Sequence, residues 1–283
     1  WLRSRKRNGK PTLIDPGLFS SKLFTTGVSQ QMLQQITLGG AMISLPIFLQ
    51  MVLEYNALEA GLSMAPLSLS MFASALIAGK KTGHRRPAKV ILLGFILTTV
   101  GMGLLLPIVP RAHSGWYLVI PLIIAGCGLG LLVSQLNNYT LSPIDEERAS
   151  EAAGVNSAAG SFGLSFGLAF AGAIMLATLS FAFTKMAEDS KVLAPDQQEQ
   201  VADTLEHDAQ VVSNTQLEEL LQGQPQEVQD EIIRINTDAR PLSLQIALLV
   251  PVLAALLGVL NSLRMLRLPD PQPSEAAEMM LGG

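Results

Sequence analysis

Amide side chains inside otherwise apolar segments are the residues of this sequence best suited to bind a small molecule. Five are singled out by their position: Gln30, Gln34, Gln135, Asn138 and Asn156. An uncharged amide offers both a donor and an acceptor, so a few amides can orient a bulky amphipathic ligand while apolar side chains supply contact area. The alternative is that each amide bonds a neighbouring helix, an interaction that contributes on the order of 0.6 kcal/mol. The residue types leave both roles open.

Two of these amides belong to a stripe along one face of a helix. Gln30 and Gln34 continue into Thr37, Ala41 and Ser44 at the period of an α-helix. Polar groups within a membrane segment avoid lipid because their exposure there is costly. We therefore predict that the stripe faces protein or water. Its paired glutamines favour water, that is, a wet surface inside the protein.

Residues that would support other chemistry are missing from the apolar segments. The single cysteine, Cys127, excludes a disulfide framework, and the three histidines lie outside the apolar segments without ligand partners at helical spacing. Glu54, Glu59 and Glu151 stand at segment ends, so no carboxylate lies at mid-bilayer depth to carry a proton. We expect no catalytic residue, metal site or cofactor, and we expect another part of the protein to supply a proton-coupling carboxylate.

Six apolar segments must position the amides. Each is long enough, at about 1.5 Å rise per residue, to cross all or most of a hydrocarbon core of roughly 30 Å. We predict an all-α membrane protein, a bundle of six transmembrane helices at 24–53, 60–78, 90–109, 116–142, 152–183 and 242–263. Pro46 should bend the first helix near its outer end.

Small residues four positions apart mark the fourth and fifth segments. They are Gly126 and Gly130 in one, and Gly163 and Gly167 in the other. Lipid gives no hydrophobic drive for helix association, so close backbone approach at small residues must hold membrane helices together. The spacing predicts that these two segments form a closely packed pair.

The distribution of charge predicts the orientation of the chain. Residues 185–240 hold thirteen acidic and four basic residues, whereas the turn between the second and third segments gathers Lys80, Lys81, Arg85, Arg86 and Lys89. Short basic loops stay on the cytoplasmic side. We therefore place this turn and both chain ends in the cytoplasm, in a multi-pass protein of a bacterial plasma membrane.

The same pattern divides the chain into parts. We interpret 1–22 as a cytoplasmic connector, 23–184 as transmembrane helices one to five, 185–241 as an extracytoplasmic acidic loop, 242–264 as the sixth helix and 265–283 as a disordered cytoplasmic tail. Apolar residues at helical spacing predict short amphipathic helices within 197–212 and 215–235, with a break at Pro225. The chain opens without methionine, which suggests a piece of a longer protein.

Three local features carry a resemblance to a known family. They are the run Leu13-Ile14-Asp15-Pro16-Gly17-Leu18-Phe19, the stretch from Leu141-Ser142-Pro143 to Gly154-Val155-Asn156, and the large outer loop. With six spans and a basic turn after the second, the chain resembles the C-terminal half of a major facilitator superfamily transporter, within it the fourteen-span drug:proton antiporter branch. The resemblance implies that an N-terminal half of the same polypeptide completes the transporter. The basic turn departs from the family signature, since Gly83 and His84 stand where that signature has aspartate and arginine.

The resemblance implies a function in secondary active transport. We expect export of amphipathic or cationic compounds, as in multidrug efflux, by alternating access driven by the proton gradient. The expected partners are the lipid bilayer, a small amphipathic substrate and the N-terminal half; no nucleic acid is expected. A membrane channel or a structural membrane scaffold is the alternative, although no ring of charge or carbonyl filter is legible. A membrane enzyme ranks third, because no nucleophile and base pair lies near either interface.

Overall fold

The described part of the chain is built from helices and contains no strand. The computed structural model describes residues 14–80, 86–193 and 214–269. Its α-helices are α2 (Lys22–Ile47), α3 (Ala57–Gly79), α4 (Pro87–Ile108), α5 (Val119–Leu141), α6 (Ala149–Glu188), α8 (Asn214–Leu220), α9 (Gln226–Ala247) and α10 (Leu249–Met265). Six stretches are long and apolar enough to cross a membrane, the sixth being α9 and α10 together. The predicted all-α membrane fold with six spans is confirmed.

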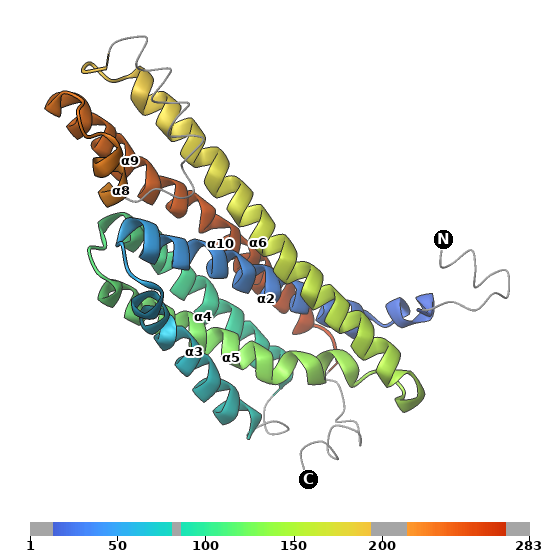
Figure 1. The fold of residues 1–283 in the computed structure, drawn as a ribbon. Coiled ribbons are helices and arrows are strands. Elements are labelled where there is room, and N and C mark those ends of the chain that lie inside the picture. The colour runs from blue at the N-terminus through green and yellow to red at the C-terminus, as the bar shows by residue number, and fades with distance from the viewer. Residues whose placement is uncertain (1–13, 81–85, 194–213, 270–283) are drawn as a thin grey trace.

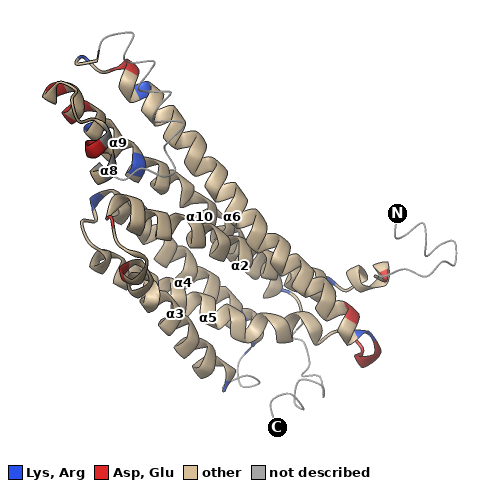
Figure 2. Ribbon diagram, in the orientation of Figure 1, with Lys and Arg blue, Asp and Glu red and all other residues tan. Residues whose placement is uncertain are grey.

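The helices pack in two groups that share a common core (Figure 1). α2 lies along α6 and α10, and α5 lies along α3 and α4. α10 joins the groups because it also packs on α4. Fully buried side chains from both groups, including Phe48, Phe95 and Tyr139, form the main hydrophobic cluster between them. Charged residues gather at the two ends of the bundle and leave its middle apolar (Figure 2).

The glycine stripes lie at close helix contacts, but the predicted pairing is wrong. Gly126 and Gly130 of α5 lie against the main chain of α3, and Gly163 and Gly167 of α6 lie against the main chain of α2. A side chain at any of the four would collide with the neighbouring backbone. α5 and α6 make little contact with each other. Each glycine stripe therefore joins its helix to an earlier one in the chain.

The outer end of α2 departs from regular helix after Pro46. Proline has no main-chain N–H and cannot continue the helical bonding pattern. Two residues later the helix widens into a π-helix, Phe48–Val52, in which the Leu53 N–H donates to the Phe48 carbonyl over 3.2 Å. α3 then begins after its N-cap Asn56, whose side chain and that of Glu59 form a capping box. The expected irregularity at Pro46 thus leads into a tight turn between α2 and α3.

Two stretches are far longer than a membrane crossing requires. α6 has 40 residues, and α9 with α10 spans another 40, so each is about 60 Å long at about 1.5 Å per residue. Figure 1 shows α6 and α9 projecting together past the ends of α3, α4 and α5. Charged residues occur along the first part of α9 as far as Arg240, so we place that part outside the hydrocarbon core. We call the projecting ends of α6 and α9, together with α8, the outer extension.

The outer extension changes the predicted boundaries of the acidic loop. α6 continues to Glu188, past the expected end of the fifth span, and the expected boundary at 241 falls inside α9. The predicted break at Pro225 is found between α8 and α9, while 197–212 lies outside the described residues. Apolar side chains of α6, α8 and α9 form a separate hydrophobic cluster in the extension, with Phe183, Leu217 and Ile235 among its buried members. This second core explains how two helices can stay together beyond the membrane.

The end of the connector belongs to the bundle. Asp15 caps a short 3-10 helix, Pro16–Ser20, by accepting a 2.8 Å bond from the Gly17 N–H. Leu18 of this helix is buried against Phe24 and Ala152. Residues 1–13 of the connector and 270–283 of the tail lie outside the described residues.

Candidate functional site

The polar stripe of α2 is buried within the bundle. All five of its members are at most 3% exposed. The Gln30 Nε2 donates to the Gly258 carbonyl over 3.1 Å and to the Ser262 Oγ over 2.7 Å, both on α10. The stripe therefore faces protein, and the expectation of a wet surface is wrong. For Gln30 the structure provides the interhelical bonds of the alternative role.

Gln34 lies one turn further along the same face and is satisfied less well. Its side chain is 3% exposed, and its Oε1 is buried without a hydrogen-bond partner. The hydroxyl of Ser44, further along the stripe, is also buried and unpartnered. Buried polar atoms without partners are unusual enough to call for an explanation such as a water, an ion or a ligand.

Gln135 occupies a different interface from the α2 stripe. It borders a cavity of about 210 Å³ between α3, α4 and α5, together with Ser74 and Leu131. Its Nε2 lies 3.4 Å from the Ser134 Oγ. The residues that line the cavity belong to α3, α4 and α5, and none belongs to α6, the helix of Asn156.

Asn156, near the start of α6, connects this helix with the last turns of α5. Its Nδ2 donates to the Asn137 Oδ1 over 2.8 Å, and its own Oδ1 is buried without a partner. Asn138, next to Asn137, accepts from the Ser142 Oγ, with 3.4 Å to its side-chain oxygen. Gln30 and Gln34 thus share one face of α2, while Gln135, Asn138 and Asn156 lie elsewhere, and the five predicted amides do not converge on one site.

Three amides that the sequence did not single out lie near Asn156. Gln31 and Gln35 of α2 lie against Gly160, one helical turn along α6 from Asn156, and Asn137 is its bonding partner. The Gln35 Oε1 is also buried without a partner. We call Gln31, Gln35, Asn137 and Asn156 the amide cluster. Gln31 and Gln35 share the spacing of Gln30 and Gln34, so periodicity alone could not tell which of the two stripes faces α6.

A charge cluster ties the connector to the turn before α6. Arg148 lies 3.3 Å from the Asp15 carboxylate and 3.4 Å from that of Glu151. The Asp15 N–H also donates to the Glu151 carboxylate. The two sequence runs that carried the family resemblance are therefore in contact with each other.

A cavity of about 920 Å³ opens at the outer ends of α3 and α5. Leu62, Pro66 and Ile123 contribute apolar walls, while Glu59 and the largely exposed Trp116 stand at its edge. Its volume is in the range of sites for drug-sized molecules, roughly 300 to 1,000 Å³. The sequence gave no sign of this cavity, since no motif marks its lining.

The sequence model of the Major Facilitator Superfamily matches residues 3–168 of the chain. The chain belongs to this superfamily. The matched part holds the connector, α2 to α5 and the first half of α6, which includes the amide cluster and the charge cluster.

Individual members of the superfamily match over a similar region. The chain is 26% identical over 191 residues to a "Probable actinorhodin transporter" of Streptomyces coelicolor, covering 66% of this chain and 33% of that protein. It is 28% identical over 187 residues to a "Multidrug resistance protein B homolog" of Mycobacterium tuberculosis, covering 64% and 32%. It is 31% identical over 168 residues to a "Putative multidrug resistance protein MdtD" of Yersinia pestis, covering 58% and 35%. The chain therefore spans about a third of the length of these curated relatives.

The basic turn of this superfamily member is only partly described. Lys80 is the residue after α3, Arg86 is the residue before α4, and Lys89 lies in the first turn of α4; all three side chains are exposed. Lys81 and Arg85 lie outside the described residues. Figure 2 shows Lys and Arg residues at the end of the bundle opposite the outer extension.

Proposed function

We propose that this chain is the C-terminal half of a secondary active transporter of the fourteen-span drug:proton antiporter branch. The complete protein would export amphipathic or cationic compounds across a bacterial plasma membrane by alternating access driven by the proton gradient. The match to the Major Facilitator Superfamily over residues 3–168 carries the proposal. The names of two relatives, which refer to multidrug resistance, support the substrate class. The cationic turn at the end opposite the acidic outer extension supports an orientation with both chain ends in the cytoplasm.

The amide cluster is the part of this half that we propose to line the substrate pathway. Its members come from three helices, and two of its oxygens, on Gln35 and Asn156, are buried without a partner. Uncharged donors and acceptors within apolar walls suit substrates that differ in shape and carry few polar groups. Of the other predicted amides, Gln34 and Asn138 keep this role as a proposal, whereas the contacts of Gln30 and Gln135 favour helix packing.

The N-terminal half of the same polypeptide would cover apolar faces that this half leaves open. Phe162, Phe166 and Phe170 form a stacked row along α6, with ring centroids 6.1 Å and 5.2 Å apart, and all three are exposed. In the most apolar stretch of α3, only 11% of the residues are buried inside the bundle. The two helices offer apolar surface to a second bundle, and the remaining outer faces offer it to lipid.

Proton coupling would depend on that second half. In the described spans, acidic residues lie near the helix ends and in the outer extension, as Glu59 and Glu151 do. A carboxylate exposed alternately to both sides must stand near the middle of the bilayer. The coupling carboxylate is therefore proposed to belong to the N-terminal half.

Export of a fluorescent cationic dye from cells that carry the full-length protein tests the proposal. Asn156→Ala and Gln35→Ala should slow export, while Asn261→Ala on α10, with its half-buried side chain, serves as the matched control. Collapse of the proton gradient should abolish export by the parent protein. A parent that expels no dye, or whose export persists without the gradient, refutes the proposed activity. Unaltered export by both variants at equal protein level refutes the assignment of the amide cluster.

A further inference from the structure

The turn between α2 and α3 holds an unusual backbone conformation at a charged residue. Glu54 has φ of 53°, and no other non-glycine residue in the described ranges has a positive φ. The left-handed region is unfavourable for a residue with a Cβ, so surrounding contacts must maintain it. Glu54 also lies two residues after the π-helix at the end of α2, with Leu53 between them. The conformation of this helix end is therefore sensitive to whatever holds Glu54.

The Glu54 carboxylate reaches across to the outer extension. It accepts a 3.2 Å bond from the Thr215 N–H and a 2.6 Å bond from the Thr215 hydroxyl. Thr215 belongs to the first turn of α8, where main-chain N–H groups lack partners inside the helix. Two bonds from one threonine fix the position of α8 relative to the end of α2.

Arg240 adds an electrostatic attraction between the same parts. Its side chain is 6% exposed on α9, bonds the Asn236 Oδ1 over 2.8 Å and is attracted electrostatically by Glu54. It also borders a cavity of about 180 Å³ whose other walls include Met51 and Val52 of the π-helix. The space next to the π-helix gives the outer end of α2 room to shift its side chains.

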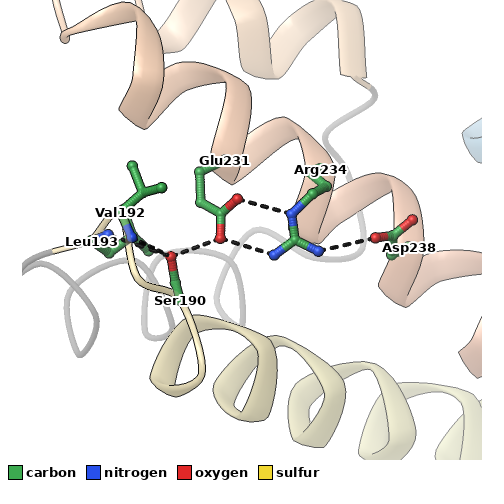
Figure 3. A network of polar contacts seen from close by, with 6 residues as sticks. All are labelled: Ser190, Val192, Leu193, Glu231, Arg234 and Asp238. Carbon is green, nitrogen blue, oxygen red and sulfur yellow. Dashed lines mark hydrogen bonds and ion pairs between the residues drawn. The ribbon is translucent and has the colours of Figure 1, made fainter.

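The outer extension is held together by its own polar and apolar contacts. Glu231 of α9 accepts bonds from Arg234 and from Ser190, which follows α6, and Arg234 also reaches Asp238 (Figure 3). Leu217 places α8 in the hydrophobic cluster that joins α6 to α9. α8, α6 and α9 are thus cross-linked by polar and apolar contacts, and Thr215 is one edge of this unit.

We propose that Glu54, held by Thr215 and attracted by Arg240, is a latch that fastens the outer end of α2 to the outer extension. While the latch is closed, the π-helix and the turn after it keep one position against α8 and α9. Release of the carboxylate frees the segment that follows Pro46 to move independently of the extension. This inference rests on the proposed transport function in one respect, namely that such movement would open or close the outer side of the pathway.

The test measures the latch directly in the full-length protein in lipid vesicles. Spin labels at Gln50→Cys and Gln222→Cys, both exposed sites, report the distance between the end of α2 and the extension in a Cys127→Ala background. Glu54→Gln and, separately, Thr215→Val should each broaden the distance distribution roughly twofold because the segment then samples several positions. Glu59→Gln is the matched control, since this exposed carboxylate bonds only the start of its own helix.

The outcomes separate the latch from the transport activity. Unchanged distributions in the two latch variants overturn the latch, whatever the protein transports. Broadening in both variants with no change in Glu59→Gln supports it, even if the parent exports no dye. If Glu54→Gln does not fold, Thr215→Val alone decides, because it alters an exposed side chain on the opposite side of the contact.

Discussion

Replacement of Gln30 by methionine distinguishes a packing role from a substrate-binding role for this buried amide. Methionine has a similar length and no strong hydrogen-bonding group, so the substitution removes the bonds to α10 with little change in volume. Gln30 is fully buried, and its Nε2 donates to the Gly258 carbonyl and the Ser262 Oγ. If the role of Gln30 is to form those bonds, the substitution should lower the free energy of unfolding only modestly, and transport should persist.

The structure sets the size of the expected effect. Polar contacts between membrane helices average about 0.6 kcal/mol and reach about 1.7 kcal/mol. The Gly258 carbonyl keeps its bond from Ser262 when Gln30 is lost, and the Gln30 Oε1, which has no partner, disappears with the amide. Both facts reduce the cost, so we expect Gln30→Met to change the free energy of unfolding by less than about 1 kcal/mol.

A double-mutant cycle with Ser262→Ala measures the pair itself. We expect a coupling energy of about 0.6 kcal/mol, equivalent to a roughly threefold change in the unfolding equilibrium. Thermal or denaturant unfolding of purified full-length protein in mild detergent gives this value, with Gln50→Met as an exposed control. Zero coupling together with a tenfold loss of dye export at equal folded protein would refute the packing role and return Gln30 to the substrate pathway.

Three further predictions concern other parts of the bundle. Gly163→Val should sharply reduce the yield of folded protein in size-exclusion chromatography because its side chain would strike the main chain of α2, whereas Gly154→Val, with open space around it, should not; equal yields would contradict the contact. Bonds from Arg234 and Ser190 hold the pKa of Glu231, in the outer extension, at about 2, so the stabilisation it provides is present above its ordinary value near 4.5 and is lost as the pH falls toward 2. Hydrogen exchange in the first half of α9 should accelerate over that range, and no change would refute the role of this network. Half-buried Cys127, inside α5, should react with a membrane-impermeant thiol reagent only after unfolding, and rapid labelling of folded protein would show instead that α5 lines an open vestibule.

The sequence by itself determined the number and the approximate ends of the membrane helices. Lipid offers no partner for main-chain N–H and C=O groups, so a long apolar run must be helical to cross it, and the run can be read directly. The break at Pro225 and the irregularity after Pro46 were predictable for a similar reason, because proline removes a donor from the helix.

Only the tertiary structure decided what each helix face contacts. Two glutamine stripes of equal spacing run along α2, and the structure turns Gln30 toward α10 and Gln31 toward α6. Likewise, the glycines of α5 and α6 indicated close contacts but not that their partners are α3 and α2. A helix places side chains at a fixed period, yet its rotation about its own axis depends on complementary surfaces from distant parts of the chain. The contact between Glu54 and Thr215, 161 residues apart, depends on the same long-range packing.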